Sequence, residues 1–278
     1  MTTQIQELEV IARELRCLAV TAIHRAGSGH AGGSLSAADI TAALYFSVLN
    51  IDPQRPDWPE RDRLVLSKGH GCPILYAALA RRGFFPIEEL WTLRQRGSRL
   101  QGHPDMRKTP GVDATTGSLG QGISVAVGMA LGARFQRQDY RVYCLMGCGE
   151  QQEGQVWEAA MSAAHYCLDN LIGIVDYNTL QIDGCNAEIM EIAPLADKWR
   201  AFGWRVLEIN GHDMAQILDA LTEARNTRGK PTVIIAHTVK GKGVSFMENE
   251  VKWHSSVVTR EVYEQAIAEL GCTGVGHD

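Results

Sequence analysis

The sequence lacks three features that would each indicate a different class of protein: a long hydrophobic run, an excess of positive charge and a leader segment. No apolar stretch approaches the roughly 20 residues that a membrane-spanning helix requires. The net charge of -5 gives no reason to expect nucleic acid or an anionic membrane as a partner. Residues 1–7 contain neither a basic nor an apolar segment, so no secretory signal is expected. These absences predict a cytoplasmic protein.

The cysteines are too scattered for a disulfide or zinc framework. There are seven, an odd number, and no two of them form a Cys-x-x-Cys pair. In a chain without an export signal, free thiols are the expected state and a zinc framework is not expected. All the cysteines except Cys148, which lies in a motif described below, are therefore expected to pack as small apolar residues.

What the sequence does contain is the patterning of a globular α/β protein. Its 278 residues are 45% hydrophobic and 21% charged, without a repeat, low-complexity tract or linker. The pattern predicts helices over 5–26, 37–48 (with Ser36 as N-cap), 73–82, 120–136, 154–168 and 215–228. Short apolar runs predict strands at 63–67, 142–146, 171–175, 205–209 and 232–237. Uninterrupted apolar strands are typical of a doubly wound, mostly parallel sheet with helices on both faces.

Two turns follow the central strands, at the sheet edge where ligands bind in such folds. The first, Gly147-Cys148-Gly149-Glu150, has two glycines that allow backbone amides to approach a phosphate closely. A dinucleotide-binding Gly-x-Gly-x-x-Gly pattern fails, because residue 152 is Gln. The second contains Asn178, whose side-chain oxygen, with the carbonyl of Leu180, suits a hard cation such as Mg²⁺. Taken alone, the first turn is equally consistent with a tight strand-to-helix connection.

Together, the two turns and several further segments resemble the motifs of the transketolase family. The family's diphosphate-and-metal motif reads Gly-Asp-Gly, then a spacer, then Asn, and residues 147–150 and 176–184 follow it except at Cys148. The resemblance covers most of the chain and implies the thiamine diphosphate-binding fold, in its diphosphate-binding (PP-type) form. The other matching segments, in chain order, are 28–30, 67–71, 102–104, 115–122, 152–158, 240–243 and His254.

The resemblance implies roles for particular residues. His30, His103 and His254 would orient sugar hydroxyls and exchange protons, which imidazoles do well near neutral pH. Glu153 would communicate between sites near a subunit interface, although a solvated acid in the first turn of a helix explains it equally well. The implied cofactor ligands are His70, Gly117, Ser118, Leu119, Gly149, Glu150, Asn178 and His254, and the implied metal ligands are Asn178, Leu180 and the residue at position 148, Cys148.

The remaining histidines have no motif around them. They are expected to be ordinary surface or core residues, and they are His24, His165, His212, His237 and His277.

The family pattern also implies a partner polypeptide. Full-length members add a pyrimidine-binding domain, whose glutamate activates the cofactor, and a C-terminal domain, whereas residues 1–278 resemble a single diphosphate-binding domain. Because the cofactor lies between the diphosphate domain of one polypeptide and the pyrimidine domain of another, the resemblance implies a split transketolase in an α2β2 assembly. The implied reaction transfers a two-carbon ketol unit from a ketose, phosphorylated or not, to an aldose, using thiamine diphosphate and Mg²⁺.

Cys148 stands where the family has aspartate, and it leaves alternatives open. A thiol is a soft ligand and Mg²⁺ a hard cation, so magnesium affinity should fall. The chain could bind the cofactor weakly and still work, with a softer metal among the options. It could instead be a cofactor-free paralogue with a binding or regulatory role. A redox role for the thiol, or another thiamine diphosphate reaction such as one similar to deoxyxylulose-phosphate synthesis, are further alternatives. Two carboxylates within the same motif, Glu150 and Asp176, are candidates to compensate for the missing aspartate.

Overall fold

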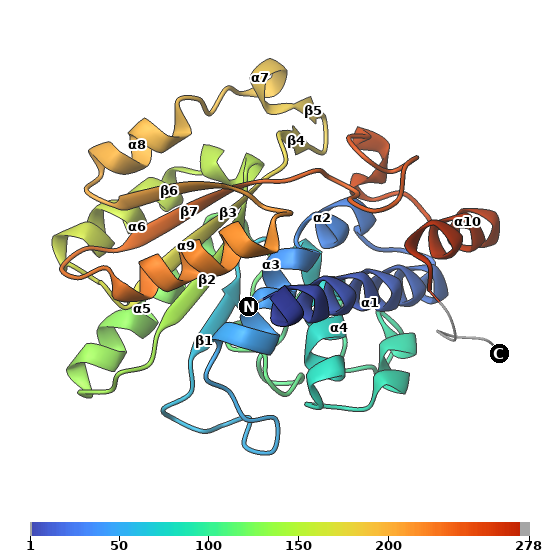
Figure 1. The fold of residues 1–278 in the computed structure, drawn as a ribbon, viewed down its shortest axis with the longest axis horizontal. Helices are drawn as coiled ribbons and strands as arrows, with labels where there is room; N and C mark the ends of the chain where they lie inside the picture. The colour runs from blue at the N-terminus through green and yellow to red at the C-terminus, as the bar shows by residue number, and fades with distance from the viewer. Residues whose placement is uncertain (1, 273–278) are drawn as a thin grey trace.

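A five-stranded parallel sheet forms the centre of the computed structural model, which describes residues 2–272 (Figure 1). The order of its strands is β1-β2-β3-β7-β6, and every neighbouring pair is parallel. This sheet confirms the predicted α/β class. The strands are β1 (Arg63–Leu66), β2 (Val142–Gly147), β3 (Leu171–Tyr177), β6 (Arg205–Asn210) and β7 (Thr232–His237), and a separate antiparallel ribbon joins β4 (Leu180–Gln181) to β5 (Gly184–Cys185).

The helices connect the strands and flank the sheet. They are α1 (Thr2–Ala26), α2 (Ala31–Ser36), α3 (Ala38–Ala43), α4 (Cys72–Arg82), α5 (Gln121–Phe135), α6 (Gly154–His165), α7 (Asn186–Ile189), α8 (Leu195–Ala201), α9 (Met214–Asn226) and α10 (Arg260–Leu270). Short turns of other helix types are η1 (Leu44–Val48), η2 (Gly69–Gly71), η3 (Ile87–Thr92), η4 (Gly149–Gln152) and η5 (Val251–His254). Within residues 2–272, no helix is both long and apolar enough to cross a bilayer.

Helices cover both faces of the sheet because alternate strand residues point to opposite sides. On one face Tyr143 and Leu145 pack with residues of α1, α3, α4 and α9. On the other face Val142, Cys144 and Met146 pack with α5, α6 and α8. Figure 1 shows α1 and α4 on one side of the sheet and α5 and α6 on the other. The two cores therefore bury each central strand on both faces, which explains its uninterrupted apolar sequence.

The predicted N-cap at Ser36 is wrong. Ser36 is the last residue of α2, and Ala37 precedes the first turn of α3. The Ser36 hydroxyl does not cap a helix, because it donates hydrogen bonds to the carboxylate of Asp176, at 2.6 Å, and to the carbonyl of Gly33. The hydroxyl that the sequence pattern assigned to a helix N-terminus thus hydrogen-bonds a buried carboxylate instead.

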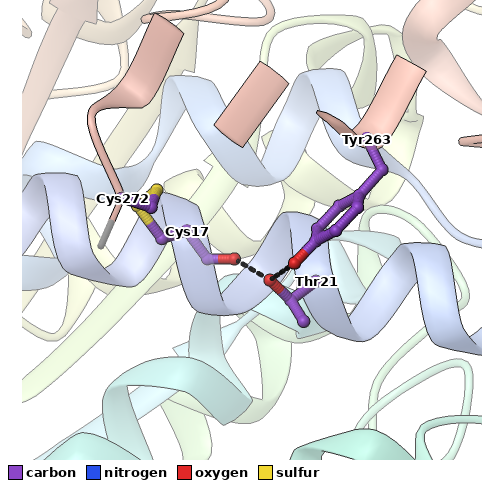
Figure 2. The surroundings of a disulfide bond; sticks show 4 residues. All are labelled: Cys17, Thr21, Tyr263 and Cys272. Atoms are coloured by element: carbon purple, nitrogen blue, oxygen red, sulfur yellow. Dashed lines mark hydrogen bonds between the residues drawn. A yellow bond between two sulfur atoms is a disulfide. The ribbon is translucent and has the colours of Figure 1, made fainter. Parts of the chain in front are cut away.

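The prediction that all cysteines are free is also wrong. Cys17 on α1 and Cys272, just beyond α10, form a disulfide with their Cα atoms 6.1 Å apart (Figure 2). The same two helices meet at Thr21, whose hydroxyl lies 3.3 Å from the phenol oxygen of Tyr263. Cys167 is exposed and therefore does not pack in the core, whereas Cys17 does. The disulfide ties the last described helix to the first, although 255 positions separate the two cysteines in sequence.

Candidate active site

A cavity of about 410 Å³ opens at the edge of the sheet where β2 and β3 end. Loops after β1, β2, β3 and β7 line it, which is the position expected for a ligand site in a parallel sheet. Of the residues assigned roles by the sequence, only Ser118 does not line this cavity, and it is exposed. The structure therefore brings together His30, His70, His103, Gly117, Leu119, Cys148, Gly149, Glu150, Glu153, Asn178, Leu180 and His254.

Three imidazole rings form a cluster in this cavity. His30 precedes α2, His70 lies in η2 and His254 ends η5, so three distant segments each supply one ring. The ring centroids of His30 and His70 are 5.1 Å apart, and that of His254 lies 5.4 Å from the first and 5.2 Å from the second. The fourth predicted histidine, His103, lies against Gly117, where a Cβ atom would come 3.0 Å from its ring.

Burial and neighbouring cations keep these imidazoles neutral. Burial is the largest cause for each, and it lowers the pKa of His30 to about 4, that of His70 to about 2 and that of His254 to about 3. Arg94 adds to the effect at His30, Lys68 at His70 and Lys240 at His254. A neutral imidazole has one donor and one acceptor nitrogen, so a ring with both nitrogens unengaged can hydrogen-bond a hydroxyl in either direction.

Lys240 fixes the tautomer of one of these rings. Its Nζ lies 3.0 Å from His254 Nδ1 and donates a second bond, also 3.0 Å, to the carbonyl of Leu180. Because an ammonium group is only a donor, His254 Nδ1 must accept and its Nε2 must carry the proton. Burial lowers the pKa of Lys240 to about 8, so most of it is still charged at neutral pH.

The loop before Lys240 is held by a second buried network. The amide of Val239 donates to His212 Nε2 at 2.8 Å, so the proton of His212 lies on Nδ1, which donates to Asp39 at 2.7 Å. Arg16 also contacts Asp39 through both carboxylate oxygens. Burial raises the pKa of Asp39, but His212 and Arg16 outweigh it, so the pKa lies below its ordinary value.

Lys68, which lines the cavity, forms a buried ion pair with Asp176. The ammonium of Lys68 also donates to the Gly33 carbonyl at 2.7 Å. Asp176 accepts further hydrogen bonds from Ser36, from Thr238 and, at 3.2 Å, from the side-chain amide of Asn178. Burial raises the pKa of Asp176, but the Lys68 ammonium and these donors outweigh it and bring it below its ordinary value.

Glu150 holds three loops of the site together. Its carboxylate accepts from the Ser67 hydroxyl, from the amide of Gly120 at 2.8 Å and from the amide of Gly147 at 3.0 Å. Burial raises its pKa, and the three donors oppose that shift. The carboxylates of Glu150 and Asp176 are therefore already engaged and cannot replace the family's aspartate.

The cavity fits the diphosphate end of a cofactor. Four glycines line it, and a Cβ atom on Gly33 would lie 3.7 Å from Lys68 Nζ, while one on Gly149 would lie 3.2 Å from the side chain of Gln181. Glycine thus leaves room for phosphate oxygens to approach backbone amides. The Lys240 ammonium and neutral imidazole donors supply the positive charge and hydrogen bonds that such oxygens accept.

Nearly the whole chain matches a family of known proteins. A family model described as the thiamine diphosphate-binding domain of transketolase matches residues 8–274. The chain belongs to the transketolase family. It is 52% identical over 270 residues to the 6-deoxy-6-sulfo-D-fructose transketolase subunit SqwG of Clostridium sp. (strain MSTE9), covering 97% of this chain and 98% of that protein.

Other relatives divide into short and long transketolases. The chain is 45% identical to one of the apulose-4-phosphate transketolase subunits of Phocaeicola vulgatus, covering 96% of this chain and 95% of that protein. It also matches the structure of transketolase from Leishmania mexicana with a TM-score of 0.91 and 37% identity, over 97% of this chain. The match spans only 42% of that longer chain.

The donors at the family's metal position do not fit Mg²⁺. Cys148 is 2% exposed, and its Sγ lies 3.7 Å from Asn178 Oδ1. Of the three predicted metal ligands, that amide oxygen and the Leu180 carbonyl are hard donors, and the carbonyl already accepts from Lys240. Among the residues that the structure describes, no group of three or more His, Cys, Asp or Glu could hold a metal ion.

Sequence reasoning missed the charged residues that support this transketolase site. Lys68 and Lys240 lie inside the segments that resemble the family, yet their partners are far away in sequence, so no local pattern reveals the pairs. The ordinary roles expected for His24 and His237 agree with their contacts, since His24 stacks on Tyr263 and His237 lies edge-on to Tyr177. His277 lies outside the described residues.

Proposed function

We propose that this chain is the N-terminal subunit of a split transketolase that transfers a two-carbon ketol unit from a ketose to an aldose. The observation that carries the proposal is the cluster of His30, His70 and His254 in a cavity that fits a diphosphate. The near-complete match to subunits of two sugar-specific transketolases supports the same reaction. The named relatives act on a sulfosugar and a sugar phosphate, so we expect an anionic ketose as donor.

When bound, thiamine diphosphate supplies the carbon nucleophile that attacks the donor ketose. The residues of this chain orient the sugar and move its protons. We propose that His30 and His103 hold the hydroxyls beside the reacting carbon, because both rings are neutral donors or acceptors at the cavity wall. The fixed tautomer of His254 presents Nε2–H as a donor, while its Nδ1 stays on Lys240. Glu153 is proposed to act at the subunit interface.

The proposal requires a second subunit. The chain matches the diphosphate-binding part of longer transketolases, and we propose that residues 1–278 form that one domain. The pyrimidine-binding and C-terminal domains would then come from a partner polypeptide, in an α2β2 assembly. His70, Gly117, Gly149 and Asn178 are the proposed ligands of the cofactor in this chain. Mg²⁺ is expected to bind weakly, because Cys148 replaces a carboxylate.

Calorimetric titration of thiamine diphosphate and Mg²⁺ into the complex of both subunits tests the proposal. Saturable heat, followed by ketol transfer between sugars, is the expected result. If the wild type gives no heat while Cys148→Asp clearly binds the cofactor, the proposal that the wild type is an active enzyme is wrong. If neither protein gives heat, the cofactor assignment or the partner is wrong.

Cys148 also favours a second candidate, a cofactor-free paralogue with a binding or regulatory role on the same fold. The thiamine diphosphate content of the purified complex distinguishes the two candidates. An active transketolase should retain thiamine diphosphate, whereas a regulatory paralogue should bind its partner subunit equally well with and without the cofactor.

A further inference from the structure

We propose that a basic cavity beside the active-site cavity binds the anionic end of the donor ketose, a sulfonate or a phosphate. The inference rests on the proposed function, because the donor would extend from the imidazoles into this second cavity. The basic cavity has a volume of about 500 Å³. Four cations line it, Arg94, Arg96, Arg99 and Lys108, and its other lining residues are uncharged.

Most of this charge has no counter-charge. The side chains of Arg94, Arg96 and Lys108 make no hydrogen bond and no ion pair within the described part of the chain. Arg99 differs, because its guanidinium binds both carboxylate oxygens of Glu89, with N–O distances of 2.6 and 2.5 Å. All three unpaired cations are exposed. They therefore repel one another until an anion enters the cavity between them.

Guanidinium and ammonium groups suit a sulfonate or a phosphate. The planar guanidinium donates two parallel hydrogen bonds to two oxygens of such a group, and an ammonium acts on it as a point charge. Arg94 and Arg96 supply the first kind of contact and Lys108 the second. The sugars named for the two short relatives, 6-deoxy-6-sulfo-D-fructose and apulose-4-phosphate, carry groups of this chemistry.

The basic cavity adjoins the active-site cavity at residues 101–103. Gln101 lines the first and His103 lines the second. Their Cα atoms are separated by at most about 7 Å, because an extended chain advances no more than about 3.6 Å per residue. Arg94 lies against the residue between them, since a Cβ atom on Gly102 would come 2.7 Å from its Nε. A ketohexose held by the imidazoles can therefore place its far end among the cations.

Arg94 also acts on two of the imidazoles. Burial is the largest cause of the lowered pKa values of His30 and His103, and the Arg94 guanidinium is the next. The same cation thus lies within electrostatic reach of both rings while it lines the basic cavity. Positive potential extends from one cavity to the other, and it favours a sugar whose far end is negative.

The loop that carries these cations is closed on itself. The Arg94 amide donates to the Leu100 carbonyl at 2.8 Å, and the Ser98 hydroxyl accepts from the Leu100 amide at 3.0 Å. Arg94 has a φ of 60°, which is uncommon for a residue other than glycine and persists only where the surrounding structure holds it. The loop therefore presents its cations from an ordered turn, which lowers the entropic cost of binding an anion.

Ketol transfer by the complex of both subunits, with donors that differ only at the far end, tests the inference. The donors are D-fructose and 6-deoxy-6-sulfo-D-fructose, and the variant combines Arg96→Gln with Lys108→Gln. Arg94 stays in place because its charge also acts on the imidazoles. The ratio of kcat/KM for the sulfo sugar to that for D-fructose should fall roughly 10- to 100-fold, because two charge-assisted contacts are lost.

Arg82→Gln, which removes an exposed cation outside the cavity, is the matched control and should keep the wild-type ratio. An unchanged ratio in the double variant overturns the inference and leaves the proposed function standing. If no donor supports ketol transfer, the proposed function is wrong, and calorimetry of 6-deoxy-6-sulfo-D-fructose binding decides the inference separately. Tighter binding by the wild type than by the double variant would support it, and equal or absent binding would overturn it.

Inorganic phosphate distinguishes the end of a sugar from a separate effector. If the basic cavity belongs to the donor site, phosphate should compete with the sulfo sugar, and the double variant should lose this competition. Phosphate that instead lowers kcat with D-fructose, through the same two residues, would reveal a regulatory site and overturn the assignment to the donor.

Discussion

Replacing Lys68 with methionine should destabilise the protein strongly, because it leaves a buried carboxylate without its counter-charge. The side chains of Lys68 and Asp176 are 2% and 0% exposed. Methionine retains much of the side-chain length, so loss of charge dominates over loss of packing. Removing one partner of a buried ion pair costs about 3–5 kcal/mol, and the lost bond to the Gly33 carbonyl adds about 1 kcal/mol. The free energy of unfolding should therefore fall by about 4–6 kcal/mol at neutral pH.

Urea unfolding at neutral and acidic pH tests this reasoning. In the wild type the pKa of Asp176 is lowered, so its stabilising effect is present above the unfolded-state pKa of about 4 and is lost as pH falls through the folded-state value. Without the ammonium, burial raises that pKa, so the gap between variant and wild type should narrow as the medium becomes acidic.

The exposed pair of Arg200 and Asp197 provides the control, and Arg200→Met should cost less than about 0.5 kcal/mol. A loss below about 1 kcal/mol for Lys68→Met, or a gap that stays constant with pH, would refute the account.

Three further predictions concern the site, a close packing contact and the disulfide. Lys240→Met should raise the pKa of His254 from about 3, because it removes a neighbouring cation, and nuclear magnetic resonance titration of the ring measures this. Gly122→Ala would place a Cβ 2.3 Å from a hydroxyl oxygen and should lower the free energy of unfolding by about 1–3 kcal/mol. Gly128→Ala, in the same helix but with nothing within 4 Å, should raise it by about 0.5–1 kcal/mol. Thermal unfolding of the two variants measures the difference. Cys17→Ser should lower stability by about 2–5 kcal/mol in oxidising buffer only, since it opens a loop with a sequence separation of 255; guanidinium unfolding with and without reductant is the check.

The sheet was predictable because its central strands β2, β3 and β7 are buried on both sides, whereas the edge strand β6 is partly exposed. Each predicted strand appears, and β7 has the predicted bounds, since apolar runs of strand length have few other ways to be buried. The helix at 31–36 was missed because its two glycines are poor helix formers, and tertiary burial of all six residues stabilises it instead. α10 was missed although Thr259 offers a visible N-cap, whose side chain accepts from the amide of Val262.

The site was predictable only where its residues sit in motifs. His30, His70 and His254 were predicted from neighbouring glycines and from family resemblance; their rings lie together, and their roles stay a prediction. The supporting contacts depend on the folded chain: Lys68 meets Asp176 across 108 positions, and no periodicity connects them. The disulfide was invisible for the same reason. These pairs stabilise the fold, yet their partners lie far apart in sequence, so a sequence pattern does not reveal them.

The charged groups of the cavity indicate that it still attracts a diphosphate without the family's aspartate. Lys68 is neutralised by Asp176, and the clustered imidazoles are neutral. Lys240 also lines the cavity, where its ammonium hydrogen-bonds a carbonyl and an imidazole, and the carboxylates of Glu150 and Glu153 line the same cavity. An aspartate at position 148 would offset this charge, whereas a thiol does not.

In a chelator, wild-type protein should therefore bind thiamine diphosphate more tightly than Cys148→Asp, because the substitution adds a negative charge beside the diphosphate. Adding Mg²⁺ should reverse that order, since the new carboxylate gives the metal its missing hard ligand. Calorimetry of both proteins under the two conditions measures the crossing. If Cys148→Asp binds more tightly in the chelator as well, Lys240 does not act as a free charge on the diphosphate.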